Sequence, residues 1–171
     1  EFEPEYAIPK HMLNSLTGHT SKAPPKQYVK NLFDDYAHRF NDALVNNLKY
    51  SLPFIVKELI LQSNSEKSEY QNLVDLGCGT GLAGKDLRDL SSNLIGIDIS
   101  ENMISEAEKL DVYDTLIVGD IVENLKASQD KFDLFVALDV LIYIGDVRSI
   151  FQAVRKCCLH DSLFVFSVEI Q

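Results

Sequence analysis

The feature that most constrains this chain is a glycine-rich stretch near its middle. It is Val74-Asp75-Leu76-Gly77-Cys78-Gly79-Thr80-Gly81, with Gly84 just beyond, and it holds four of the eight glycines. The apolar run Leu73 to Leu76 precedes the glycines and predicts a strand. The helix-like run Leu82 to Leu90 follows them, so the glycines themselves predict a tight turn that leads into a helix. Glycine permits positive φ in such a turn and lets backbone N–H groups approach a ligand. We interpret the stretch as a cradle for a nucleotide-type ligand, the alternative being a plain surface turn.

The rest of the chain continues with units of the same kind. Four further apolar or β-branched runs predict strands, and segments of polar or helical pattern separate them. The five predicted strands are Leu73–Leu76, Asn93–Ile99, Thr115–Val118, Phe132–Leu138 and Leu163–Val168. This alternation predicts an α/β fold, a doubly wound Rossmann-like and mostly parallel sheet with helices on both faces.

Short polar segments mark the boundaries of these units. Ser91-Ser92 predicts a turn, Ser100 and Asp146 predict helix N-caps, and His160-Asp161 predicts the turn before the last strand. The helix after Asp146 should bury a face that ends at Cys158.

The first part of the chain lies outside this alternation. Residues 1–26 hold four of the five prolines and predict a linker or N-terminal extension. Residues 27–62 predict a helical extension, and residues 63–171 the core. The face of its first helix is apolar: Phe33, Tyr36, Ala37, Phe40, Leu44 and Leu48. We expect this helix to cover the ligand site as a lid, with Tyr36 touching the ligand.

Acidic residues follow the predicted strands. Asp75, Asp98, Asp120 and Asp139 lie at the carboxyl ends of the first four, where ligands bind in a sheet of this kind. Asp98 is placed to accept both hydroxyls of a ribose. The alternative for Asp98 is an acid that complements a helix dipole, and Asp120 is equally consistent with an ordinary turn.

The choice of nucleoside cofactor is open at this point. Residues Gly79 to Gly84 formally satisfy the dinucleotide fingerprint G-x-G-x-x-G, with Asp98 at about the right distance. However, Asp75 stands two positions before Gly77, where it would repel a pyrophosphate and favour an ammonium or sulfonium group.

Charge and composition argue against several classes of binding partner. The net charge is −10 and no Lys/Arg block is present, which argues against nucleic acid. No apolar run reaches the ~18 residues of a membrane span, so we expect no membrane partner. The cysteines Cys78, Cys157 and Cys158 lack metal-ligand spacing, so we expect no metal, reduced thiols and a cytoplasmic location.

The motif set resembles the class I S-adenosylmethionine-dependent methyltransferases over Asn72 to Glu169. The residues that carry this resemblance are Val74 to Gly81, Gly96 to Ser100, Gly119-Asp120-Ile121 and Phe132-Asp133-Leu134. A narrower resemblance is to predicted methyltransferases associated with tetratricopeptide repeats. It is carried by His11 to Gly18, Leu32 to Ala37, Leu48 to Pro53 and Asp139 to Asp146.

The resemblance implies roles for the first motif. S-adenosylmethionine would be the cofactor, and Gly77, Gly79 and Gly81 would approach its methionine portion. Asp75 and Cys78 belong to the same cofactor-binding motif. Since nothing nearby would lower the pKa of Cys78, we expect it to pack as a small residue.

The resemblance also implies contacts to the nucleoside. Asp98 would bind the ribose hydroxyls, and Ile99 and Met103 would flank the adenine. Asp120 would bond the adenine amino group, with Ile121 beside it. The backbone around Leu138, together with Tyr143, would face the sulfonium.

The reaction implied is direct displacement at a methyl carbon, for which a base is optional. Asp139, Tyr143 and His38 are candidate bases, and no catalytic residue is assigned. The tail Ala137 to Val140 lacks the Asn/Asp-Pro-Pro-aromatic motif of enzymes that methylate nucleic-acid amino groups. A small-molecule acceptor is therefore favoured over a protein acceptor. Two alternatives stay open: a nicotinamide-dependent oxidoreductase and a non-catalytic cofactor-binding module.

The end of the chain carries one more expectation. In the family that it resembles, two further strands complete the sheet, whereas Gln171 follows Val168 almost at once. Leu163 to Val168 would then be an exposed apolar edge, which natural proteins avoid. We expect a core that is truncated after its fifth strand and continues in the complete polypeptide.

Overall fold

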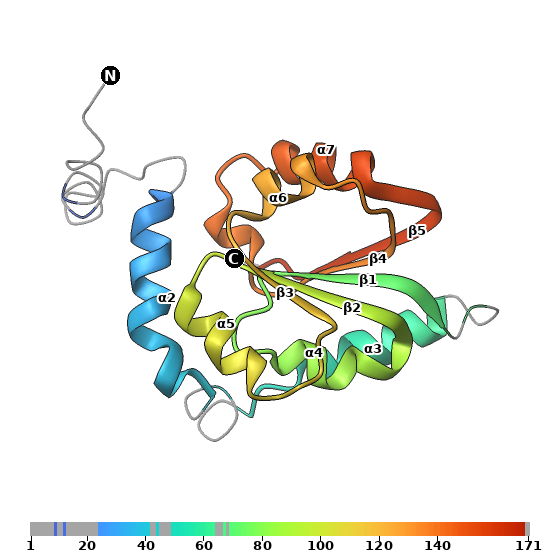
Figure 1. Ribbon diagram of the computed structural model, residues 1–171, viewed down its shortest axis with the longest axis horizontal. Helices are drawn as coiled ribbons and strands as arrows, with labels where there is room; N and C mark the ends of the chain where they lie inside the picture. The colour runs from blue at the N-terminus through green and yellow to red at the C-terminus, as the bar shows by residue number, and fades with distance from the viewer. Residues whose placement is uncertain are drawn as a thin grey trace.

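A five-stranded sheet forms the centre of the protein (Figure 1). The computed structural model describes residues 9, 12, 24–41, 44, 49–63, 67 and 69–169. The strand order is β3-β2-β1-β4-β5, and every neighbouring pair is parallel. The strands are β1 (Tyr70–Leu76), β2 (Ser91–Asp98), β3 (Thr115–Val118), β4 (Phe132–Ala137) and β5 (Cys158–Phe166).

Helices cover both faces of this sheet, so the predicted doubly wound α/β fold is confirmed. The helices are α2 (Lys26–Asn41), α3 (Leu52–Ser63), α4 (Leu82–Leu87), α5 (Glu101–Glu108), α6 (Ile121–Ala127) and α7 (Arg148–Cys157). Figure 1 shows α6 and α7 on one side and α3 and α4 on the other, with α2 packed beside α5. Short 3₁₀ helices span Arg88–Leu90 and Leu141–Tyr143.

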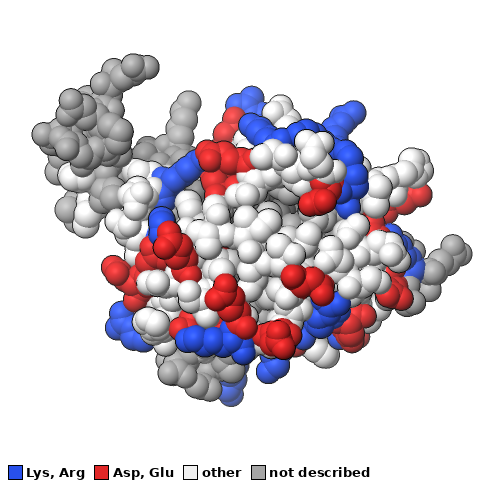
Figure 2. Space-filling view, in the orientation of Figure 1, with Lys and Arg blue, Asp and Glu red and all other residues white. Residues whose placement is uncertain are grey.

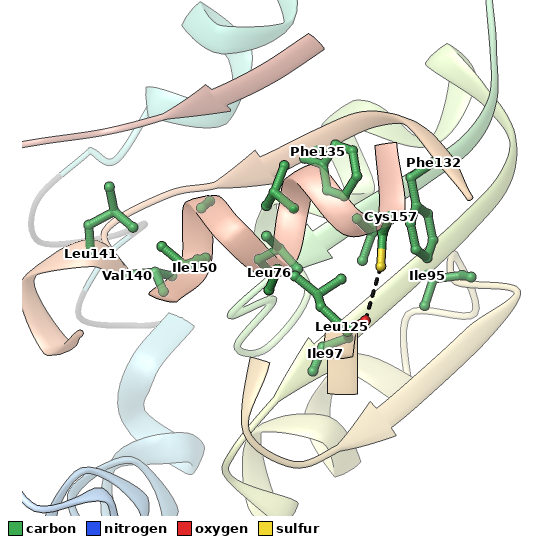
Figure 3. Close-up of a cluster of buried hydrophobic side chains, with 14 residues drawn as sticks. Leu76, Ile95, Ile97, Leu125, Phe132, Phe135, Val140, Leu141, Ile150 and Cys157 are labelled. Carbon is green, nitrogen blue, oxygen red and sulfur yellow. Dashed lines mark hydrogen bonds between the residues drawn. The ribbon is translucent and has the colours of Figure 1, made fainter. Parts of the chain in front are cut away.

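The alternation of side chains along the strands produces two hydrophobic clusters, one on each face. Leu73, Leu94 and Leu134 pack against α3 and α4. The opposite cluster, drawn in Figure 3, joins Leu76, Ile95, Ile97 and Phe135 to α6 and α7. There the thiol of Cys157 donates to the carbonyl of Leu125, which ties the two helices together. Because β4 is covered on both faces, its sequence is a near-continuous apolar run.

The predicted turn at Ser91-Ser92 is wrong, because both residues are already in β2, with Ser91 paired to Tyr70 of β1. The turn lies earlier, in the 3₁₀ helix Arg88–Leu90. Arg88 donates from its guanidinium to the carbonyls of Ser91 and Ser92, which holds the start of the strand in place.

The predicted turn at His160-Asp161 is also wrong. These residues lie within β5, at an irregularity in its pairing with β4, and Asp161 has a φ of 62°. The prediction that the buried face of α7 ends at Cys158 is wrong. The helix α7 ends at Cys157, which is buried, and Cys158 starts β5 and is only partly buried. The strand stops at Phe166 and lies at an edge of the sheet, as the prediction of an edge strand requires.

The boundary predicted at Ser100 agrees with the structure. Ser100 caps α5 by accepting a hydrogen bond from the N–H of Met103. The N-cap predicted at Asp146 is wrong, because α7 begins after Val147 and has no side-chain cap; Asp146 accepts from the N–H of Arg148 one position before that cap. Most of the predicted linker, residues 1–26, and the end of the predicted first helix, residues 45–48, lie outside the described residues.

Candidate functional site

A cavity of about 460 Å³ lies at the carboxyl ends of β1, β2 and β4. The glycine-rich turn forms its floor, and α2 lies across it with Val29, Phe33 and Phe40 in the lining. The start of α6 and the 3₁₀ helix after β4 supply the remaining walls. This is the edge of an open α/β sheet where ligands bind.

Eleven of the thirteen predicted cofactor-binding residues line this cavity. They are Asp75, Gly77, Cys78, Gly79, Asp98, Ile99, Met103, Asp120, Ile121, Leu138 and Tyr143. Gly81 and Tyr36 are outside the lining: Gly81 starts α4, and Tyr36 packs edge-on against Phe40 with ring centroids 5.7 Å apart. The roles of the thirteen residues remain predictions.

The turn after β1 depends on glycine for two different reasons. Gly77, Gly79 and Gly81 have φ values of 75°, 53° and 87°, a region that strains other residues. At Gly79 a Cβ would meet only Phe40, at 3.9 Å, so its backbone is open to the cavity. At Gly77 a Cβ would overlap the side chain of Val140. Gly79 is therefore the position whose missing side chain leaves room for a ligand.

Asp98 links the turn to the end of β2. Its Oδ2 accepts from the N–H of Gly79 at 2.9 Å, and its Oδ1 accepts from the N–H of Ser100 at 2.9 Å. The carboxylate is 8% exposed, and burial raises its pKa. Because each carboxylate oxygen has further acceptor capacity, Asp98 can still bind ligand hydroxyls in the cavity.

Tyr113 is a site residue that the sequence analysis missed. Its hydroxyl donates to Oδ2 of the buried Asp75 at 2.7 Å. A Cβ at Gly84 would overlap the ring of Tyr113, so that glycine serves packing under the cavity. Burial raises the pKa of Asp75 to about 7, with the charge of Asp98 adding to the rise and the Tyr113 hydrogen bond opposing it. No local pattern identifies Tyr113, since the contact joins residues 38 positions apart.

Cys78 behaves as the packing residue predicted for its position. It is 5% exposed, and its sulfur lies beside Gly96, where an added Cβ would come within 2.9 Å of it. Burial raises the pKa of the thiol well above its ordinary value, and the charges of Asp75 and Asp98 add to the effect. The thiol therefore stays protonated, which argues against a nucleophile.

Asp120 combines a structural role with its place in the cavity. Its Oδ1 accepts from the N–H of Glu123 and so caps α6. Its Oδ2 forms an ion pair with Lys26 of α2 at 3.0 Å, and Lys26 also pairs with Glu123 at 2.6 Å. Both alternatives considered for Asp120, a turn acid and a cavity acid, are thus consistent with its position.

Aromatic side chains form the wall beneath α2. Phe33 packs edge-on against Tyr143 with centroids 5.1 Å apart, and against Phe40 at 6.4 Å. All three rings line the cavity. The sequence analysis noted Phe33 and Phe40 on an apolar helix face, and only the folded chain brings that face over the cavity.

The three candidate bases are placed differently. Asp139 and Tyr143 line the cavity, and Asp139 accepts from the hydroxyl of Tyr50 at 2.8 Å. His38 is 76% exposed, pairs with Glu106 of α5 and is outside the lining. Tyr50 was overlooked as a site residue, although it belongs to the stretch that carries the narrower resemblance.

Polar contacts hold α2 in place over the cavity. Asn41 at its end accepts from the Thr80 hydroxyl in the glycine-rich turn. Asp34 accepts from the Ser100 hydroxyl at 2.6 Å and pairs with Lys30. Although burial acts to raise the pKa of Asp34, these hydrogen bonds lower it below the ordinary value. The helix is thus fixed to the ends of both β1 and β2.

Metal clusters and membrane helices are absent from the part of the chain that the structure describes. There, no three His, Cys, Asp or Glu side chains gather in a group that could hold a metal ion. No helix within the described ranges has the length and apolar character to cross a membrane. All three cysteines are free thiols.

Figure 2 shows basic side chains most frequent over α6 and α7, and charges of both signs elsewhere on that face.

Comparison with known proteins shows which family the chain matches. Residues 74–166 match the family described as Methyltransferase domain. The probable S-adenosylmethionine-dependent methyltransferase CRG1 of Saccharomyces cerevisiae is 39% identical over 70 residues, which cover 41% of this chain and 23% of that protein. The aligned segment thus spans less than a quarter of the yeast relative.

Solved structures with the same fold are numerous. The complex of DhpI with SAH has a TM-score of 0.67 and 16% identity, over 82% of this chain and 67% of that one. Magnesium protoporphyrin IX methyltransferase (ChlM) from Synechocystis PCC 6803, with bound SAM, has a TM-score of 0.61 and 20% identity, over 78% of this chain and 71% of that one. At these identities the likeness is one of fold.

Proposed function

The chain belongs to the methyltransferase domain family, and from this membership we propose that it transfers a methyl group from S-adenosylmethionine to an acceptor. The main observation behind the proposal is the hydrogen bond between the N–H of Gly79 and the carboxylate of Asp98. An acid that ends the second strand accepts the N–H of a turn glycine whose open side faces the cavity. That arrangement presents a ribose-binding carboxylate beside a backbone cradle.

The site fits S-adenosylmethionine in three respects. Asp98 is placed for the ribose hydroxyls, and the open space at Gly79 suits a chain that lies against the turn. Ile99, Met103 and Ile121 offer apolar surface to a flat base. Asp75 and further carboxylates in the lining suit a ligand that carries ammonium and sulfonium groups.

The chain's own residues have defined tasks under this proposal. When bound, the cofactor supplies a methyl group activated on a sulfonium. Asp98 holds the nucleoside end, Gly79 leaves room for the methionine portion, and the wall formed by Phe33, Phe40 and Tyr143 excludes water. Under this proposal the α2 helix is the lid: it supplies part of that wall, and the Asn41–Thr80 hydrogen bond holds it to the glycine-rich turn. Positioning is the main catalytic contribution in such a site.

A small-molecule acceptor is the proposed substrate class. A cavity of about 460 Å³ beneath α2 supports this choice, and the related structure ChlM is by name a methyltransferase of magnesium protoporphyrin IX. A protein acceptor is the second candidate. The cytoplasmic location and the grouping with repeat-associated methyltransferases are proposals that rest on the sequence alone.

Titration with S-adenosylhomocysteine and with NAD tests the cofactor. We expect S-adenosylhomocysteine to raise the melting temperature and NAD to leave it unchanged. A shift with NAD alone would favour the nicotinamide-dependent oxidoreductase. A screen of metabolite extracts for transfer of a labelled methyl group then separates an enzyme from a binding module, because a module binds the cofactor and transfers nothing.

A further inference from the structure

The cavity has an acidic lining that its own cations do not balance. Two lysines, Lys26 and Lys126, are among the lining residues, against six acids. The acids are Asp75, Asp98, Asp120, Glu123, Asp139 and Asp146.

Three of these six acids pair with cations, and two others, Asp75 and Asp98, are buried and bound by neutral donors. Lys26 pairs with both Asp120 and Glu123, and Arg148 pairs with Asp146 at 2.8 Å. Backbone N–H groups bind Asp98, and Asp75 is bound by the Tyr113 hydroxyl in the buried floor.

Asp139 is the sixth, and its partners are neutral hydroxyls. Oδ2 accepts from Tyr50 at 2.8 Å and Oδ1 accepts from Ser167 at 2.9 Å. Within the described residues, no ion pair reaches this carboxylate. Hydroxyl donors orient a carboxylate without cancelling its charge, so its field extends into the cavity.

The backbone around this contact is strained. Asp139 has a φ of 56°, and Lys49, which precedes Tyr50, has a φ of 50°. These are two of the four non-glycine residues with positive φ in the described part of the chain. Such conformations cost free energy and are concentrated at functional sites, where the surrounding structure holds them. Here they hold the Tyr50–Asp139 hydrogen bond in the lining of the cavity that also contains Phe33 and Tyr143.

We propose that Asp139, oriented by Tyr50 and Ser167, selects an amine acceptor with an apolar body over carboxylate or phosphate acceptors. This inference rests on the proposed methyltransferase function. The aromatic rings of Phe33 and Tyr143 receive the apolar body, and Asp139 accepts a hydrogen bond from the N–H group at its end. An anionic acceptor would meet an uncompensated like charge. Asp139 is thus a specificity-determining residue.

Three matched probes test the inference. Benzylamine, benzyl alcohol and benzoate carry the same ring with a cationic, neutral or anionic end at neutral pH. Their dissociation constants are measured by ligand-observed NMR, with and without saturating S-adenosylhomocysteine. We expect benzylamine to bind at least about tenfold more tightly than benzoate, with benzyl alcohol between them.

Variants assign the preference to one carboxylate. Asp139→Asn should bring benzylamine and benzoate within about threefold of each other, whereas Asp130→Asn removes the same charge outside the cavity lining and should keep the preference. Tyr50→Phe removes a donor that orients the carboxylate and should narrow the preference, and an unchanged preference would contradict the orienting role of Tyr50. This variant also tests the inference if Asp139→Asn does not fold.

Two results would overturn the inference. One is benzoate binding as tightly as benzylamine to the unmodified protein, and the other is an unchanged preference in Asp139→Asn. Failure to bind S-adenosylhomocysteine would instead contradict the proposed cofactor, and the probe measurements made without it would still decide the charge preference.

Discussion

Replacing Asp75 by asparagine should change how the stability of this protein depends on pH. Asp75 is 1% exposed and its pKa in the folded protein is about 7, against an ordinary value of 3.8. Between these two values the folded protein retains a proton that the unfolded chain has released. The free energy of unfolding therefore falls as pH rises through this range, because the folded state binds more protons.

The size of the effect follows from the two pKa values. The difference between 7 and 3.8 is about three pH units, which at about 1.36 kcal/mol each gives about 4 kcal/mol. The asparagine side chain cannot ionise, and its carbonyl can still accept the hydroxyl of Tyr113. Compared with the unmodified protein, Asp75→Asn should therefore gain up to about 4 kcal/mol of relative stability between pH 4 and pH 8.

Urea unfolding at a series of pH values, followed by circular dichroism, measures this gap. The difference curve cancels the contributions of other acids, such as Asp133, whose pKa lies below the ordinary value because its hydrogen bonds outweigh its burial. Tyr113→Phe removes the donor and should raise the pKa of Asp75 further. A gap that changes by less than about 1 kcal/mol across the range would refute the reasoning.

Three further changes have defined outcomes. Asp98→Ala should weaken S-adenosylhomocysteine binding about tenfold or more in calorimetry, because a charge-assisted contact to ribose is lost, and unchanged affinity in a folded variant would remove Asp98 from the site. Deleting residues 1–48 should lower cofactor affinity as well as the melting temperature, because α2 supplies the wall over the cavity, and a stable truncated protein with full affinity would exclude the lid. Gly84→Ala should lower the free energy of unfolding by about 1–3 kcal/mol in urea unfolding, because a Cβ there overlaps Tyr113, and an unchanged free energy would show that the ring can move aside.

Local sequence patterns predicted the five strands and the glycine-rich turn that lies in the cavity. A parallel strand that is buried on both faces is mostly apolar, and a turn with positive φ favours glycine. Both signals are local, so β1, β4 and the turn at Gly77, Gly79 and Gly81 were predicted from a few neighbouring residues. The acids at strand ends could be placed together because parallel strands bring their carboxyl ends to one edge of the sheet.

Tertiary structure decided the contacts that join distant parts of the chain. Tyr113 reaches Asp75 across 38 positions and Tyr50 reaches Asp139 across 89, and neither pairing leaves a periodic signal in the sequence. The strand at Ser91-Ser92 was missed for a similar reason, since pairing with β1 overrides the turn preference of two serines. The local hydrophobic pattern of a sequence indicates which residues of one helix or strand are buried. The raised pKa of Asp75 and the uncompensated charge of Asp139 depend instead on which groups the fold brings together, and only the folded chain specifies those neighbours.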